Sequence, residues 1–180
     1  QHTAALRLTL GGDSAVLEGY TDASWADCIP DRRSSQGHCF TLGQGVISWK
    51  ANRSPSVALS TCEAELYAGT SAAQELLWLK RMMHELGVVT TNPVLWCDNE
   101  STIALTKDPV YSARSKHIEA RYHFLRELTL LGELTAQHIP TDDNVADVFT
   151  KPLLKDRHFQ MLRLLGLNGK LSASRGCVED

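Results

Sequence analysis

The chain has 180 residues, of which 43% are hydrophobic and 22% are charged, and its formal net charge is −3. This length predicts one domain, alone or with a tail, and the composition is that of a globular protein, which excludes collagen and extended disorder. The longest apolar runs, at residues 76–79 and 164–167, are much shorter than the ~20 residues that a membrane span needs. No signal peptide is recognisable in the first residues.

The five cysteines are an odd number and contain no Cys-x-x-Cys pair. This pattern argues against a zinc site or a disulfide framework and favours a reducing compartment. The acidic net charge argues against a nucleic-acid-binding protein, for which a basic surface is expected. If four of the carboxylates bind metal ions, the remaining residues carry a slightly positive net charge. The argument against a nucleic-acid-binding protein is then weaker.

We expect a lead-in segment at residues 1–15, a folded domain at 16–167 and a polar tail at 168–180. The lead-in segment contains a Gly-Gly-Asp turn signal. The domain opens with three segments of strand character joined by turn residues, which predicts an antiparallel meander. These strands are expected at residues 16–24, 37–42 and 46–50.

The rest of the domain alternates helices with two further strands. A capping box at Ser60–Glu63 starts a long proline-free helix that continues to Gly87. The elements expected after it are a strand at 94–97, helices at 101–106 and 118–131, a strand at 134–139, a loop at 140–144, and one or two helices in 145–167 interrupted at Pro152. Because helical crossovers join the later strands to the meander, this order predicts an α/β fold with a five-stranded mixed sheet flanked by helices.

Two aspartates lie in or directly after predicted strands. Asp22 lies within the apolar first strand and is expected to be partly buried, where a carboxylate needs a partner or a metal. Asp98 ends the fourth strand, at the carboxyl edge where α/β sheets bind ligands. A turn hydrogen bond would also explain Asp22, and capping of the following helix would also explain Asp98. The two segments by themselves do not decide between a ligand role and these structural roles.

Two further acidic residues belong to predicted helices. Glu63 occupies the third helical position and is expected to fold back on the helix N-terminus as part of the capping box. Glu65 lies about 200° further around the helix and is available for another role. Asp147 starts the last helical region, where an aspartate that interacts with the helix dipole would be unremarkable.

Six sequence segments occur in one collinear order from Val16 onward. They are YTDASWAD, RRSSQGHCFTLGQGVISWK, ALSTCEAELYA, WCDNESTIAL, SKHIEARYHFLRE and NVADVFTKPL. Together they resemble the ribonuclease H domain of copia-type retrotransposon polyproteins, and the final SRGCVED resembles the end of such polyproteins. The resemblance implies a ribonuclease H fold and an endonuclease that cleaves the RNA strand of RNA–DNA hybrids after reverse transcription.

The resemblance also implies two Mg²⁺ or Mn²⁺ ions and four carboxylate ligands: Asp22, Glu65, Asp98 and Asp147. Carboxylate oxygens suit these hard cations, and two ions can activate water and stabilise the leaving 3′ oxygen. The implied partners are an RNA–DNA hybrid and the reverse transcriptase domain of the same polyprotein. The implied location is the cytoplasm, within virus-like particles.

One position departs from many ribonucleases H, which carry a mobile histidine before the last aspartate. The corresponding position here is Asp142, and we expect His138 to be a packing or surface residue.

Candidate contacts with the hybrid lie near the carboxylates. Discrimination of RNA from DNA requires recognition of 2′-hydroxyl groups, for which Ser24, Asn99 and Ser101 are candidates. The preferred basic contacts belong to a motif of the resemblance and are Arg114, Lys116 and His117. Apolar residues on the two long helices are expected in the core: Trp78, Leu79, Met82, Met83, Tyr122, Phe124 and Leu125.

Two rival functions share the predicted fold. The first is a catalytically inactive domain that binds nucleic acid or a reverse transcriptase, and the presence of all four carboxylates disfavours it. The second is another nuclease or strand transferase, such as an integrase core, and the glutamate on the first long helix disfavours it together with the copia-like motifs.

Overall fold

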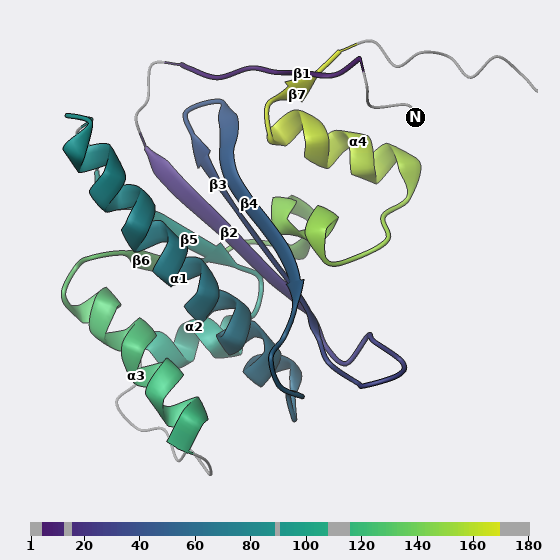
Figure 1. The fold of residues 1–180 in the computed structure, drawn as a ribbon, viewed down its shortest axis with the longest axis vertical. Helices are drawn as coiled ribbons and strands as arrows, with labels where there is room; N and C mark the ends of the chain where they lie inside the picture. The colour runs from purple at the N-terminus through teal and green to yellow at the C-terminus, as the bar shows by residue number, and fades with distance from the viewer. Residues whose placement is uncertain (1–4, 13–15, 89–90, 108–115, 170–180) are drawn as a thin grey trace, which may run out of the picture.

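A five-stranded mixed sheet forms the centre of the computed structural model, which describes residues 5–12, 16–88, 91–107 and 116–169 (Figure 1). The strand order is β4-β3-β2-β5-β6. The strands are β2 (Leu17–Ser24), β3 (Ser35–Leu42), β4 (Gly45–Arg53), β5 (Val94–Cys97) and β6 (Thr135–His138). The first three pair antiparallel, and β5 and β6 join in parallel. The predicted sheet is therefore confirmed, with β3 and β4 longer than predicted.

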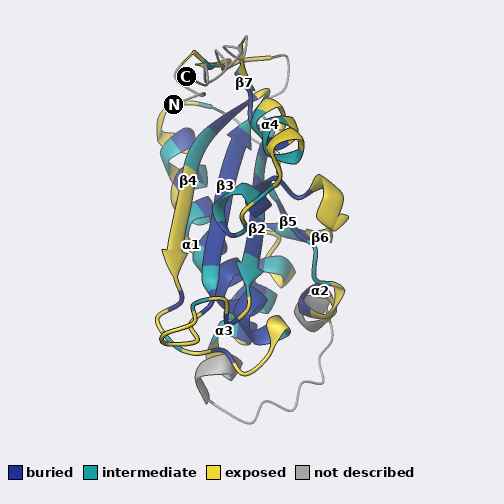
Figure 2. Ribbon diagram, turned by 90° about the vertical axis from the view of Figure 1, so that its right-hand side faces the viewer, coloured by how far each residue is buried: buried dark blue, intermediate teal, exposed yellow. Residues whose placement is uncertain are grey.

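Helices cover both faces of this sheet (Figure 1). They are α1 (Thr61–Glu85), α2 (Glu100–Lys107), α3 (Lys116–Leu130), the 3₁₀ helices η1 (Thr141–Asp143) and η2 (Val145–Phe149), and α4 (Lys155–Leu164). Successive side chains of a strand point to opposite faces. Leu17 and Phe40 therefore pack with α1 and α3, whereas Tyr20 and Cys39 pack with η2 and α4. Figure 2 shows β3 buried along most of its length, β2 with both buried and intermediate residues, and β4 exposed towards its end.

The capping box predicted for α1 is present in a slightly different form. Ser60 is the N-cap, and its Oγ accepts a hydrogen bond from Glu63 N at 3.1 Å. Glu63 reaches back to the backbone N–H of Leu59, at 2.7 Å, rather than to that of Ser60. Gly87 follows the helix with φ +74°, a conformation that favours glycine at helix ends.

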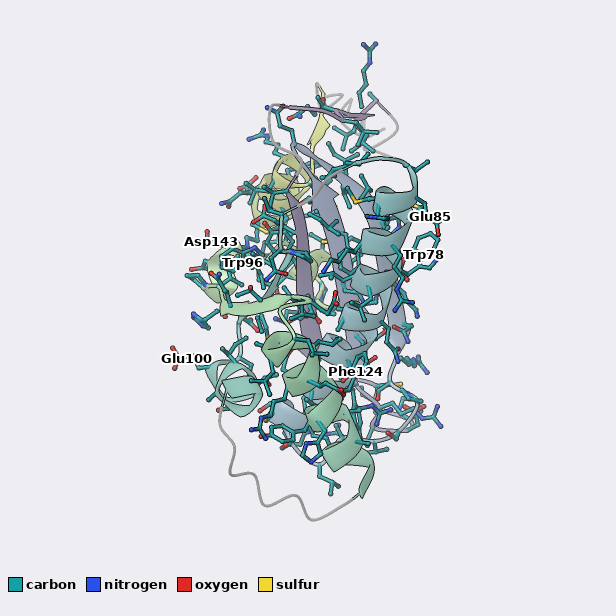
Figure 3. All side chains as sticks on the ribbon, turned by 90° about the vertical axis from the view of Figure 1, so that its left-hand side faces the viewer. Trp78, Glu85, Trp96, Glu100, Phe124 and Asp143 are labelled. Atoms are coloured by element: carbon teal, nitrogen blue, oxygen red, sulfur yellow. The ribbon has the colours of Figure 1, made fainter. Side chains whose placement is uncertain are left out.

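The prediction that Trp78 belongs to the core is wrong. Trp78 is 57% exposed and lies on the outer side of α1 (Figure 3), whereas Leu79 and Met83 are buried. A helix with 3.6 residues per turn rotates consecutive side chains by about 100°, so Leu79 faces the sheet and Trp78 does not. On α3, Tyr122 is buried as predicted. Leu125 is also buried, and Met82 and Phe124 pack against the core from partly buried positions.

The C-terminal part of the domain is less helical than predicted. The predicted loop at 140–144 contains η1, and the predicted closing helices are η2 and α4 with Pro152 between them. After α4, β7 (Leu167–Asn168) pairs antiparallel with β1 (Arg7–Leu8), which lies in the predicted lead-in segment. The boundaries at 15/16 and 167/168 stay predictions. Among the helices that the structure describes, none is long and apolar enough to cross a membrane.

Candidate metal-binding active site

Three aspartates from separate elements meet at the carboxyl edge of β2 and β5. Asp22 lies near the end of β2, Asp98 directly follows β5, and Asp147 lies in η2. One carboxylate oxygen from each of the three lies within 4.8 Å of the others. The parallel register places Thr21 opposite Cys97, so the aspartates that follow these two residues lie side by side at this edge.

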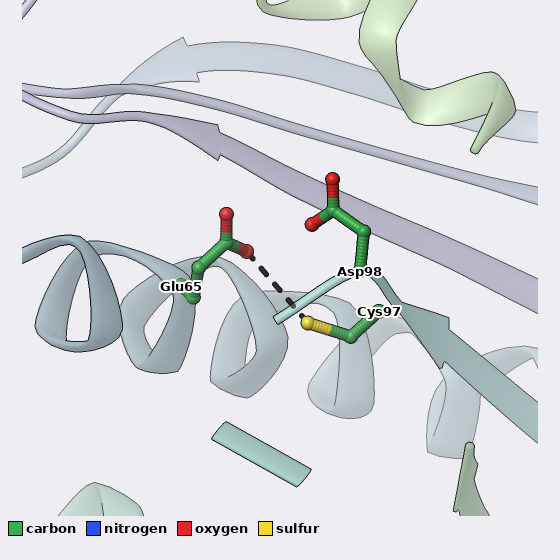
Figure 4. Close-up of side chains that lie close together, drawn as sticks. All are labelled: Glu65, Cys97 and Asp98. Atoms are coloured by element: carbon green, nitrogen blue, oxygen red, sulfur yellow. Dashed lines mark hydrogen bonds between the residues drawn. The ribbon is translucent and has the colours of Figure 1, made fainter. Parts of the chain in front are cut away.

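Glu65 reaches the same edge from α1 (Figure 4). It forms a second close group with Cys97 and Asp98, whose potential ligand atoms also lie within 4.8 Å of one another. Its Oε1 accepts a hydrogen bond from Ala23 N at 3.2 Å, and the Cys97 thiol donates to its Oε2 at 3.8 Å. Because Asp98 belongs to both groups, the four carboxylates that the sequence singled out form one cluster.

Burial and mutual repulsion change the acidity of this cluster. Burial, together with the charges of Asp22 and Asp98, raises the pKa of Glu65 to about 9. Burial also raises the pKa of Asp147, although a hydrogen bond from Lys151 opposes this effect. Buried carboxylates need hydrogen bonds or cations, so this arrangement favours the binding of positive charge.

Two residues that the sequence analysis did not single out complete the site. Lys151 Nζ lies 3.0 Å from Asp22 Oδ1 and 2.7 Å from Asp147 Oδ1, and the Thr150 hydroxyl donates to Asp22 Oδ2. Burial lowers the pKa of Lys151, but the hydrogen bond to Asp147 and the charge of Asp22 outweigh it and raise that pKa above its ordinary value. The i,i+4 spacing of Asp147 and Lys151 is the sequence signal that could have identified the lysine.

The structure decides the alternative explanation for Asp98. Asn99 Oδ1 accepts a hydrogen bond from Thr102 N at 3.0 Å, so Asn99 supplies the side-chain cap of α2. Asp98 instead accepts a hydrogen bond from the Thr141 hydroxyl at 3.0 Å. Asp98 is therefore free of the capping role and faces the cluster.

Glu63 and Glu65 have separate environments, as the capping-box argument predicts. Glu63 accepts hydrogen bonds from Leu59 N at 2.7 Å and from the Tyr67 hydroxyl at 2.5 Å. Neither of the two metal-compatible groups includes Glu63. Glu63 therefore stabilises the start of α1, whereas Glu65 belongs to the acidic cluster.

The remaining predicted site residues are the candidate contacts with the hybrid. Ser24 ends β2 in a half-buried position, and Ser101 is exposed in α2. Arg114 lies outside the described residues, as do the side chains of Lys116 and His117.

Asp142 and His138 are exposed, which agrees with a surface position for the histidine. Asp142 Oδ1 lies 3.8 Å from Arg157 Nη2.

Solved structures with a similar fold include ribonucleases H. LC11-RNase H1, isolated from compost, is 16% identical with a TM-score of 0.58, over 76% of this chain and 93% of that chain. The foamy viral protease–reverse transcriptase in complex with RNA/DNA hybrid is 13% identical with a TM-score of 0.54, over 80% of this chain and 21% of that chain. The fold is therefore that of a ribonuclease H domain, as predicted.

Sequence relatives identify the particular kind of protein. The retrovirus-related Pol polyprotein from transposon TNT 1-94 of Nicotiana tabacum is 42% identical over 161 residues, which is 89% of this chain and 12% of the polyprotein. The corresponding polyprotein from transposon RE2 of Arabidopsis thaliana is 35% identical over 157 residues, or 87% and 11%. No family model matches the chain. The chain is thus homologous to a segment of copia-type Pol polyproteins, which confirms the resemblance, and it spans 11–12% of these relatives' length.

Proposed function

We propose that the chain is a metal-dependent endonuclease that hydrolyses the RNA strand of RNA–DNA hybrids during reverse transcription. The observation that carries this proposal is the cluster of four carboxylates supplied by β2, α1, the end of β5, and η2. The substrate class is supported by the shared fold, because LC11-RNase H1 has also been solved in complex with RNA/DNA hybrid, at a TM-score of 0.55. Homology to transposon Pol polyproteins supports the context of reverse transcription.

The residues at this site fit divalent cations. Hard oxygen ligands suit Mg²⁺ and Mn²⁺, and the ammonium of Lys151 between two of the aspartates shows that the cluster accommodates positive charge. Two Mg²⁺ or Mn²⁺ ions would be held by Asp22, Glu65, Asp98 and Asp147. When bound, such ions activate water and stabilise the leaving 3′ oxygen.

The chain's own residues fix the positions of these ligands. Asp22 and Asp98 extend from paired parallel strands, and the hydroxyl of Thr150 orients one carboxylate oxygen of Asp22. The backbone N–H of Ala23 likewise orients Glu65. Ligands held on a sheet and a long helix keep their geometry better than ligands on loops, which favours a preorganised catalytic site.

Recognition of the RNA strand would use the polar residues beside the cluster. Ser24, Asn99 and Ser101 are the proposed contacts with 2′-hydroxyl groups. Since Asn99 Oδ1 caps α2, the Nδ2 amide is the group through which Asn99 would contact the hybrid. Arg114, Lys116 and His117 are the proposed phosphate contacts.

The proposed protein partner is the reverse transcriptase domain of the same polyprotein. Both the transposon Pol relatives and the foamy viral protease–reverse transcriptase support this context. We place the activity in the cytoplasm, within virus-like particles.

A cleavage assay with labelled RNA tests the function. The purified chain is incubated with an RNA–DNA hybrid, with single-stranded RNA and with duplex DNA, in Mg²⁺ or in chelator. We expect cleavage of the RNA strand of the hybrid when Mg²⁺ is present and no cleavage in chelator. The single-stranded RNA and the duplex DNA should stay intact. The Asp22→Asn variant should lose hybrid cleavage, whereas Asp156→Asn, which changes an exposed aspartate of α4, should retain it.

Other outcomes of this assay select the rival functions. Binding of the hybrid without cleavage would support an inactive binding domain. Cleavage or strand transfer on duplex DNA, with the hybrid spared, would support an integrase-like enzyme.

A further inference from the structure

Lys151 places a positive charge inside the cluster of carboxylates. Its Nζ lies 3.0 Å from Asp22 Oδ1 and 2.7 Å from Asp147 Oδ1. Both aspartates also have an oxygen within 4.8 Å of one on Asp98. The Lys151 side chain is 33% exposed, compared with 1% for Asp22 and 5% for Asp147. The ammonium therefore approaches two buried carboxylates from the solvent side.

The local backbone holds Lys151 at this point. Its N–H donates to Asp147 O at 3.0 Å, which closes one turn after η2 and brings the side chains at i and i+4 to the same side. Pro152 follows directly and cannot continue a hydrogen-bonded turn, because proline lacks the N–H. The preceding Thr150 hydroxyl donates to Asp22 Oδ2. Two successive residues thus connect η2 to the same carboxylate of β2.

The Lys151 ammonium and a divalent cation would compete for the same carboxylate oxygens of Asp22 and Asp147. Charge-assisted hydrogen bonds from Lys151 Nζ satisfy Asp22 Oδ1 and Asp147 Oδ1 and offset the repulsion between the two aspartates. A divalent cation binds carboxylate oxygens at about 2.0–2.6 Å. At that distance a cation on both oxygens would occupy the space that the ammonium fills, and the two positive charges would repel each other.

We propose that Lys151 is a tethered counter-cation, which holds Asp22 and Asp147 in place in the metal-free protein and is displaced from them when a divalent metal binds. Lys151 thereby keeps the ligands assembled and lowers the affinity of the site for metal, so that it sets the metal concentration at which the site fills. This inference rests on the proposed function, because it concerns the same carboxylates.

The test compares Mn²⁺ binding by the 180-residue chain and its Lys151→Met variant, which keeps an unbranched stem and removes the charge. Binding is measured by isothermal titration calorimetry at pH 8 without nucleic acid. We expect the Kd for Mn²⁺ to fall at least tenfold in the variant, equivalent to about 1.4 kcal/mol. The variant should also melt at a lower temperature than wild type in chelator, and this difference should shrink in saturating Mn²⁺.

Lys80→Met is the matched control. Lys80 Nζ also lies 2.7 Å from a carboxylate oxygen, that of Glu133, but it contacts no member of the cluster among the described residues. It lies 15 residues after Glu65 on α1, which corresponds to about 22 Å along the helix axis. We expect the Kd for Mn²⁺ to stay at the wild-type value in this variant.

A measurement on the wild-type sequence keeps the proposal testable if Lys151→Met does not fold. Lysine ammonium groups are converted to ¹³C-dimethyl forms, which remain cationic, and the Lys151 signal is assigned with a Lys151→Arg variant. Addition of Mg²⁺ should shift this signal, and an unchanged signal at saturating Mg²⁺ would overturn the proposal.

The titrations test the role of Lys151 and the existence of the metal site separately. A folded Lys151→Met variant that binds Mn²⁺ no more tightly than wild type would overturn the role of Lys151 and leave the proposed nuclease intact. A wild-type chain that binds no Mn²⁺ would overturn the metal site itself, and the proposed function with it.

Discussion

Gly37 lies directly opposite Asp22 in the antiparallel register of β2 and β3. A Cβ atom at position 37 would lie 2.7 Å from the Cβ of Phe149 and 2.8 Å from Cγ2 of Thr150. The absence of a side chain therefore lets η2 approach the sheet closely enough for Thr150 and Lys151 to reach Asp22. The close packing of η2 on β3 is thus a condition for assembly of the acidic cluster.

The first prediction follows from this packing. Gly37→Ala should lower the free energy of unfolding by about 1–3 kcal/mol, as overpacking does, and should weaken Mn²⁺ binding because η2 has to move away. Gly69→Ala is the control, since a Cβ there would meet only Leu125 Cδ1, at 3.6 Å, an ordinary contact. Urea denaturation and Mn²⁺ titration measure the two effects. Wild-type stability and metal affinity in Gly37→Ala would contradict the explanation.

The second prediction concerns Asp98→Asn, which keeps the shape of the side chain and removes its charge. Each ~1.4 kcal/mol of lost transition-state stabilisation is a tenfold loss in rate, so removal of one ligand should depress hybrid cleavage by orders of magnitude. In chelator the variant should melt at a higher temperature than wild type, because one like charge has left the cluster. Added Mg²⁺ should stabilise the variant less than wild type.

Thermal melts with and without Mg²⁺ measure both effects on stability. The substitution leaves the side-chain cap of α2 in place, because Asn99 provides it. Superimposable melting curves for the two proteins, in chelator and in Mg²⁺, would argue against a metal ligand at position 98.

The third prediction is a dependence of stability on pH. Burial and the neighbouring aspartates raise the pKa of Glu65 from 4.5 to about 9, so between these values the folded state keeps a proton that the unfolded state releases. The free energy of unfolding of the metal-free protein should therefore fall as pH rises across this range, by up to about 1.4 kcal/mol per pH unit from this group. The contribution is complete below about pH 4.5 and lost above about pH 9.

Glu65→Gln should remove this slope, since glutamine does not titrate. Urea denaturation in chelator at pH 5, 6.5 and 8 should show the variant gaining stability relative to wild type as pH rises. Parallel stability profiles for the two proteins would mean that Glu65 titrates at its ordinary pKa.

The fourth prediction compares the same substitution at two positions of one helix. Glu63→Gln weakens the hydrogen bonds from Leu59 N and the Tyr67 hydroxyl, so it should lower the free energy of unfolding by about 1 kcal/mol. Its hybrid cleavage should stay near the wild-type rate. Glu65→Gln should instead lose cleavage by orders of magnitude. Chemical denaturation and the cleavage assay are applied to both variants. Loss of cleavage in Glu63→Gln would contradict the assignment of a structural role to Glu63 and of a role in cleavage to Glu65.

Local sequence patterns were sufficient for most of the fold. Strand alternation and turn residues identify the meander, and the Ser60 cap and Gly87 delimit α1, because these signals depend on neighbours a few residues apart. The same patterns could not decide that Trp78 is exposed, since burial depends on which face of the helix meets the sheet. They also predicted more regular helix after residue 145 than the structure has. In the structure, η2 is a short 3₁₀ helix that packs against β3.

For the site, the sequence by itself determined which carboxylates to consider and that Glu63 differs from Glu65. The difference between Glu63 and Glu65 follows from the periodicity of one helix, whereas the set of four carboxylates follows from the resemblance of six collinear segments to copia-type ribonuclease H domains. Only the tertiary structure decided that Asn99 rather than Asp98 caps α2, and that Lys151 bridges Asp22 and Asp147. The reason is physical: Lys151 and Asp22 are 129 residues apart, and their contact depends on how closely η2 packs against the sheet.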